Sequence, residues 1–131
     1  MTRILIADDH EGMRKTLRSL LESRADFMIC GEAADGIEAI NKTKEMEPDL
    51  LVLDISMPNV DGLEAARVIR KFFPAIRILI LSVHRSSQIL KEAQKIGVDG
   101  FVEKSKNGKA LLKAIDEVLN NERFFAASAG Y

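Results

Sequence analysis

The chain has 131 residues, 47% of them hydrophobic and 30% charged, which is the composition of one globular domain. Its 19 basic and 20 acidic residues give a formal net charge of -1, which argues against a basic surface that grips nucleic acid. The single cysteine, Cys30, excludes a disulfide framework and a thiolate zinc cluster. No apolar stretch is long enough for a signal-peptide core or a membrane span, so we expect a cytoplasmic protein.

Short apolar runs alternate with amphipathic segments along the chain. The runs predict strands, and apolar residues at helical spacing predict the helices between them. Asp35 and Asp61 each precede an acid three residues later, which is a capping pattern, and Pro48 and Pro74 follow as helix stops. We predict strands at residues 3–7, 27–31, 50–53, 76–81 and 100–102, and helices at residues 11–23, 36–47, 62–72, 87–96 and 111–119.

This alternation predicts an α/β fold, with a parallel sheet that helices cover on both faces. Five strands fit either a doubly wound order, 2-1-3-4-5, or a simpler sequential order. In the doubly wound order the winding reverses between the first and third strands, and ligands bind at such a point. The placement of the polar residues favours this order. We therefore predict a doubly wound five-stranded parallel sheet with five helices.

Polar side chains follow four of these strands at the point where each strand ends. Asp8 and Asp9 follow the first strand, Asp54 the third, Ser82 the fourth and Lys104 the fifth. The carboxyl ends of parallel strands share one edge of the sheet, so these side chains are expected to converge. An Asp after a strand is commonly a helix N-cap, and this alternative applies to Asp9 taken alone. The five residues together favour one functional site.

Three clustered carboxylates raise one another's pKa and require a compensating cation. Lys104 offsets one charge, and a hard divalent cation with oxygen ligands, Mg²⁺, fits the remainder. The sequence suggests no convergent His or Cys cluster, which disfavours zinc and copper. A carboxylate beside Mg²⁺, a hydroxyl and a lysine suits phosphoryl transfer through an aspartyl phosphate. The chain has no GxxxxGK[ST] loop for a nucleotide, so the donor must bring its own phosphoryl group.

Over residues 3 to 121 the sequence resembles the receiver domain of two-component response regulators, which has the CheY-like, flavodoxin-like fold. The Asp-Asp-His start, the Ser-Val-His segment and Lys104-Ser105 look most like the NarL/FixJ branch. The matching segments are Ile4-Leu5-Ile6-Ala7-Asp8-Asp9-His10, Asp35-Gly36-Ile37-Glu38-Ala39, Leu53-Asp54-Ile55-Ser56-Met57-Pro58, Asp61-Gly62, Leu81-Ser82-Val83-His84, Gly97-Val98-Asp99-Gly100-Phe101 and Lys104.

The resemblance implies that Asp54 accepts a phosphoryl group from the phosphohistidine of a sensor histidine kinase. It also implies that Asp9, Asp54 and the backbone carbonyl of Ser56 ligate Mg²⁺, with Asp8 assisting. A receiver of this kind assists its own phosphorylation and dephosphorylation and is not an enzyme acting on external substrates.

The resemblance further implies that Lys104 contacts the phosphoryl group, that Ser82 is the switch hydroxyl and that Phe101 is the switch aromatic. Two positions depart from the commoner pattern. Phe101 replaces Tyr, so its ring can be buried without stranding a hydroxyl. Val83 replaces a smaller residue and is expected to reduce access for small phosphodonors. His84 is expected at the rim of the site, where it tunes hydrolysis.

We expect residues 1–122 to form the receiver and residues 123–131 to be a tail or the start of a linker. Members of this branch continue into a helix-turn-helix domain that binds promoter DNA. Phosphorylation would then switch the surface of the fourth helix, fifth strand and fifth helix, with homodimerisation as a possible result. We expect a receiver separated from such an output domain, and a stand-alone receiver is the alternative.

Three other functions compete with phosphorylation signalling. The first is an interaction module that keeps the fold without being phosphorylated, against which the intact set of acids, hydroxyl and lysine argues. The second is a Mg²⁺-dependent phosphohydrolase, for which the chain lacks a cap domain. The third is flavin binding, which the three acids disfavour because they would repel the phosphate of FMN.

Overall fold

The central strands are the most deeply buried part of the protein, because helices cover both faces of the sheet. In the computed structural model, residues 4–7, 50–54 and 78–82 are all buried. The structure describes residues 1–83, 86–104 and 108–125. The elements are β1 (Thr2–Ala7), α1 (Glu11–Glu22), β2 (Phe27–Ala33), α2 (Gly36–Met46), β3 (Leu50–Asp54), α3 (Gly62–Phe72), β4 (Arg77–Ser82), α4 (Ser87–Ile96), β5 (Gly100–Glu103), α5 (Lys109–Leu119) and β6 (Phe124–Phe125).

The strand order is β2-β1-β3-β4-β5-β6, and all neighbouring strands are parallel. This confirms the doubly wound order 2-1-3-4-5 and extends it by one short strand. Phe124 pairs with Gly100, and Phe125 pairs with Phe101. We expected these residues to belong to a tail or linker. They join the sheet because Phe125 packs on one hydrophobic cluster and Phe124 on the other.

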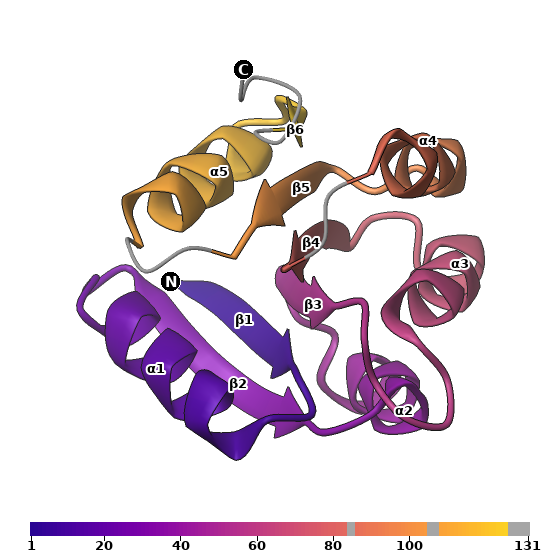
Figure 1. Ribbon diagram of the computed structural model, residues 1–131. Helices are drawn as coiled ribbons and strands as arrows, with labels where there is room; N and C mark the ends of the chain where they lie inside the picture. Colours follow the sequence, from indigo (N-terminus) through magenta and orange to yellow (C-terminus); the bar gives the residue numbers. More distant parts are fainter. Residues whose placement is uncertain (84–85, 105–107, 126–131) are drawn as a thin grey trace.

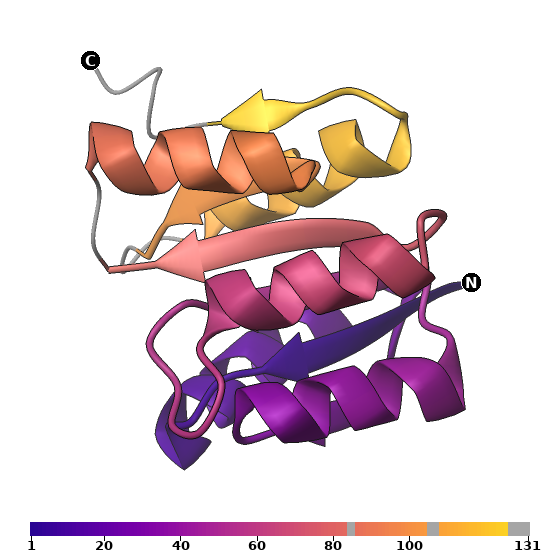
Figure 2. The same cartoon turned by 90° about the vertical axis from the view of Figure 1, so that its right-hand side faces the viewer.

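The helices form two layers, and Figure 1 shows α1 and α5 on one side of the sheet with α2, α3 and α4 on the other. Each layer has its own hydrophobic cluster, one centred on Leu5, Leu53 and Ile80 and the other on Ile4, Val52 and Leu79. Figure 2 shows the strands of the sheet running in the same direction beneath α2, α3 and α4. Across the described ranges, no helix is both long and apolar enough to cross a membrane.

Side-chain caps begin three of the helices, as their sequences predict. The Asp35 carboxylate accepts from the amide of Glu38 at 2.8 Å, and the Asp61 carboxylate accepts from that of Glu64 at 2.9 Å. Ser86 does the same at the start of α4, at 3.1 Å. These caps fix where α2, α3 and α4 begin, and therefore the length of the loops that leave the carboxyl edge of the sheet.

Candidate functional site

The carboxyl edge of the sheet between β1 and β3 brings together two buried carboxylates. Asp8 directly follows β1, and Asp54 is the last residue of β3. The strands are neighbours, with Ala7 paired to Leu53, so the two acids lie at the same level of the edge. Asp8 is 1% exposed and Asp54 is 4% exposed. The winding of the sheet reverses here, because β1 is flanked by β2 on one side and by β3 on the other.

Lys104 extends into this edge from the end of β5. Its ammonium Nζ lies 2.8 Å from Asp8 Oδ2 and 3.4 Å from Asp54 Oδ1, and its side chain is only 13% exposed. The backbone amide of Lys104 donates to the carbonyl of Ser82 at 2.7 Å, which ties the end of β5 to the end of β4. Ser82 is itself 2% exposed at the same edge. Three of the residues that we expected to converge, Asp8, Asp54 and Ser82, are therefore buried at one edge of the sheet, and the first two contact the Lys104 ammonium.

Asp9 lies at the open rim of the site, where its side chain is 30% exposed and contacts His10. His10 Nδ1 is 3.0 Å from Asp9 Oδ1 and 3.4 Å from Asp8 Oδ1. One ligand atom from each of these three residues lies within 4.8 Å of the other two, a spacing that could hold a metal ion. Lys104 links Asp54 to this group through Asp8.

The structure bears on two sequence arguments about this rim. The N-cap of α1 is His10, whose side chain makes no capping hydrogen bond, so the alternative of Asp9 as the helix cap is not supported. The sequence suggested no convergent His or Cys cluster, and the structure places a single imidazole, that of His10, against Asp9. The only sequence signal for this contact is the position of His10 directly after the two acids.

Burial and charge oppose each other at the two central groups. Burial raises the pKa of Asp54 above its ordinary value of 3.8, the charge of Asp8 raises it further, and Lys104 offsets only part of the effect. For Lys104, burial alone would lower the pKa, but the hydrogen bond to Asp8 and the charges of Asp54 and Asp8 outweigh it, so its pKa is raised. Lys104 therefore remains a cation, beside the Asp54 carboxyl group, whose ionisation is disfavoured.

The loop from β3 to α3 is held close to Asp54 by a glycine. The amide of Gly62 donates to the carbonyl of Ile55 at 2.8 Å, which brings the start of α3 back over the end of β3. A Cβ on Gly62 would lie 1.9 Å from the Asp54 carbonyl oxygen, so a larger residue would displace this backbone. Ser56, whose carbonyl we expected to be a metal ligand, lies exposed in the same loop.

The two positions that depart from the common pattern lie in different surroundings. The Phe101 ring is fully buried in the cluster on the α2–α4 side of the sheet, so it faces inward. Val83 is 58% exposed at the end of β4. His84, which we expected at the rim, lies outside the described residues.

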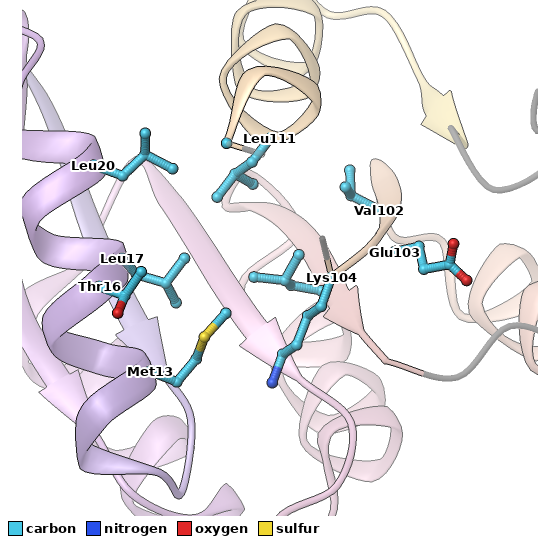
Figure 3. Close-up of a pocket in the computed structure, with 10 residues that line it drawn as sticks. Met13, Thr16, Leu17, Leu20, Val102, Glu103, Lys104 and Leu111 are labelled. Carbon is cyan, nitrogen blue, oxygen red and sulfur yellow. The ribbon is translucent and has the colours of Figure 1, made fainter. Parts of the chain in front are cut away.

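A small apolar cavity of about 60 Å³ lies behind Lys104, between α1, β5 and α5. Figure 3 shows the aliphatic part of Lys104 facing Met13 and Leu17 of α1, whereas Glu103 points away. Lys104 therefore helps to line this cavity while its ammonium lies at the carboxylates.

A doubly wound α/β sheet with buried carboxylates and a lysine at its carboxyl edge defines the class of receiver domains. Residues 4–116 match the response regulator receiver domain, and the chain belongs to that family. It is 36% identical over 121 residues to Protein CcdB of Bacillus subtilis, covering 92% of this chain and all of that protein. It is 33% identical over 125 residues to Response regulator protein VraR of Staphylococcus saprophyticus, covering 95% of this chain but only 60% of that protein.

The structural comparison agrees with the sequence relationship. A two-component response regulator of the LuxR family from Aurantimonas sp. SI85-9A1 superimposes with a TM-score of 0.91 at 37% identity, covering 95% of this chain and 89% of that one. The chain is therefore similar over nearly its whole length to a LuxR-family response regulator, and its relatives include transcriptional regulators.

Proposed function

We propose that Asp54 is a phosphoacceptor that takes a phosphoryl group from the phosphohistidine of a sensor histidine kinase. The observation that carries this proposal is the burial of Asp54 and Asp8 around the Lys104 ammonium at the point where the winding reverses. An Asp54 carboxylate oxygen forms the new bond to phosphorus as the phosphorus–nitrogen bond of the donor breaks. The departing imidazole retains the electron pair and takes up a proton.

The residues present fit a Mg²⁺ ion. Two carboxylates, of Asp8 and Asp54, contact the Lys104 ammonium, and a third, that of Asp9, lies at the rim. The three acids therefore carry an excess of negative charge over the lysine, and oxygen donors suit a hard divalent cation. Asp9, Asp54 and the carbonyl of Ser56 would hold the ion, with Asp8 assisting. When bound, Mg²⁺ neutralises charge on the carboxylates and on the transferring phosphoryl oxygens.

The remaining site residues complete the proposed switch. Lys104 contacts a phosphoryl oxygen, and the Ser82 hydroxyl moves toward another. The Phe101 ring, which is buried in one cluster with residues of α4, is held in this inward position as Ser82 moves, and the movement of Ser82 changes the surface formed by α4, β5 and α5. The free energy that couples two distant sites of a protein, here Asp54 and the α4–β5–α5 surface, is typically about 1–3 kcal/mol. Phosphorylation of Asp54 is therefore expected to shift an existing equilibrium between two conformations of that surface.

The output of the switch is proposed from the relatives. The chain spans 60% of VraR and 52% of Transcriptional regulatory protein LnrK of Bacillus subtilis. We expect this cytoplasmic receiver to control a helix-turn-helix domain that binds promoter DNA, with homodimerisation on phosphorylation. A stand-alone receiver is the alternative, and reading the gene downstream of codon 131 distinguishes the two.

Phosphorylation is tested with phosphoramidate, a donor that carries a phosphorus–nitrogen bond, in the presence of Mg²⁺. Intact-protein mass spectrometry is expected to detect one phosphoryl group on the wild type and none on Asp54→Asn. Ser82→Ala is the control, because it leaves the acceptor in place. Labelling of Asp54→Asn at the wild-type level would contradict the assignment. Because Val83 is expected to slow small phosphodonors, labelling is followed to long times at high phosphoramidate concentration, and a wild type that binds Mg²⁺ but stays unlabelled there would favour the interaction module.

A further inference from the structure

Arg14, in the first turn of α1, joins the acidic loop to strand β2. Its Nη1 donates to the backbone carbonyl oxygen of Asp8 at 2.6 Å, and its Nε donates to Glu32 Oε1 at 3.0 Å. The Arg14 side chain is only 16% exposed, so water competes little for either bond. The guanidinium therefore bridges the β1–α1 loop and the strand beside it.

The Arg14 bond completes a set of contacts that hold Asp8 through all four of its polar atoms. The Asp8 amide donates to the carbonyl of Ala33 at 2.9 Å. Its Oδ1 accepts from the backbone amide of His10 at 2.9 Å, and its Oδ2 accepts from Lys104 at 2.8 Å. Among the described residues, Arg14 alone donates to the Asp8 carbonyl, which is the first group of the peptide that leads to Asp9. Rotation of that peptide would move the Asp9 carboxylate relative to the Asp8 carboxylate.

Glu32 on β2 keeps Arg14 directed at the loop. It accepts from Arg14 through Oε1 and from Arg18 Nε through Oε2 at 2.8 Å, so each arginine has its own carboxylate oxygen. Lys42 donates to the Glu32 backbone carbonyl and fixes that residue from the other side. Burial alone would raise the pKa of Glu32, but the hydrogen bonds from Arg18 and Arg14 outweigh it, and its pKa is lowered. Glu32 therefore stays ionised and paired.

We infer that Arg14 is a positioning residue for the divalent-cation site. Its guanidinium bridges the Asp8 carbonyl and the Glu32 carboxylate, and so fixes the orientation of the Asp8–Asp9 peptide. That orientation determines how the Asp8 and Asp9 carboxylates lie relative to each other. Arg14 touches neither the cation nor the phosphoryl group and acts through the loop. The inference rests on the proposed Mg²⁺ site and adds a residue to it.

Arg18 provides a matched control for this role. It lies one turn further along α1, pairs with the same Glu32 and also with Glu22, and is 38% exposed. Within the described part of the chain, the Arg18 guanidinium bonds to the carboxylates of Glu32 and Glu22 and not to the Asp8 carbonyl. Arg14→Gln and Arg18→Gln each remove one ion pair to Glu32, but only Arg14→Gln removes the bond to the acidic loop.

The experiment measures Mg²⁺ affinity in the 131-residue chain from the rise of the melting temperature with Mg²⁺ concentration, followed by circular dichroism. Arg14→Gln is expected to weaken Mg²⁺ binding roughly 10- to 100-fold, the usual effect of losing a group that orients a metal ligand. Arg18→Gln is expected to leave the affinity within about twofold of wild type. Arg14→Lys keeps the positive charge but not the planar guanidinium, and it is expected to recover part of the lost Mg²⁺ affinity.

A second measurement needs no metal and separates this inference from the proposed function. In metal-free buffer, the backbone amide resonances of Asp9 and His10 are expected to shift or broaden in Arg14→Gln and to stay in place in Arg18→Gln. Unchanged resonances, or equal Mg²⁺ affinity in the two variants, would overturn the positioning role. A wild type that shows no Mg²⁺-dependent stabilisation would instead overturn the metal site, and the resonances would still decide the role of Arg14 in the loop.

Discussion

Replacing Lys104 by Met removes the ammonium that both buried carboxylates contact. At an effective dielectric constant of about 20, charges 2.8 Å and 3.4 Å apart attract by about 6 and about 5 kcal/mol. The free-energy cost of removing the three groups from water offsets much of this attraction. Removing one partner of a buried ion pair typically costs about 3–5 kcal/mol, and we expect Lys104→Met to lower the free energy of unfolding by that amount in metal-free buffer at neutral pH.

The loss should depend on pH and on metal in a defined direction. Lys104 lowers the pKa of Asp54, so without it Asp54 binds a proton more readily and the strain is relieved as the pH falls. Added Mg²⁺ should also reduce the loss, because it supplies the missing positive charge. Urea unfolding followed by circular dichroism measures both effects. Lys113→Met, at an exposed position on α5, is the control and should change stability by less than about 0.5 kcal/mol.

Two results would refute this reasoning. A Lys104→Met protein within about 1 kcal/mol of wild type at neutral pH in EDTA would mean that the carboxylates do not need the ammonium. A loss that stayed constant from neutral pH down to about pH 3 would mean that it arises from packing around the methylene groups, because Asp54, whose pKa is raised, is largely protonated at the lower pH.

Three further predictions test other parts of the site and core. Because the pKa of Asp54 is raised above 3.8 in the folded protein, Asp54→Asn should stabilise the metal-free protein at neutral pH and lose that advantage as the pH falls toward 3.8, as followed by urea unfolding. Thr43 is fully buried, and its hydroxyl has no hydrogen-bond partner among the described residues. Thr43→Val removes the hydroxyl and keeps the volume, so it should raise the free energy of unfolding by about 1 kcal/mol in thermal unfolding. Thr43→Ala should give no such gain, because it leaves a cavity. Phe101→Ala should cost about 3–5 kcal/mol, and Phe101→Tyr about 1–3 kcal/mol if the ring stays inward, in the same urea assay.

Much of the fold could be predicted from the sequence because parallel strands buried on both faces must be continuously apolar. The same logic places Asp8, Asp54, Ser82 and Lys104 at one edge, since the carboxyl ends of parallel strands meet there. The caps at Asp35 and Asp61 were equally predictable, because they depend on residues three apart.

What escaped prediction depends on side-chain contacts or on very short elements. β6 has two residues, too few for any periodic pattern, and its pairing depends on aromatic packing against both hydrophobic clusters. The Arg14 contacts join the β1–α1 loop to Glu32, 18 positions away. Nothing in the spacing of charged residues distinguishes Arg14 from Arg18, which pairs with the same carboxylate.

The short strand β6 has a practical consequence for where this receiver should be cut when it is expressed or fused. The family match ends at residue 116, inside α5, and β6 lies beyond it. A protein trimmed to that boundary would lose the last turn of α5 and uncover the backbone edge of β5 beside Phe101. Fusions should therefore be joined after residue 125, so that Phe124 and Phe125 remain in place.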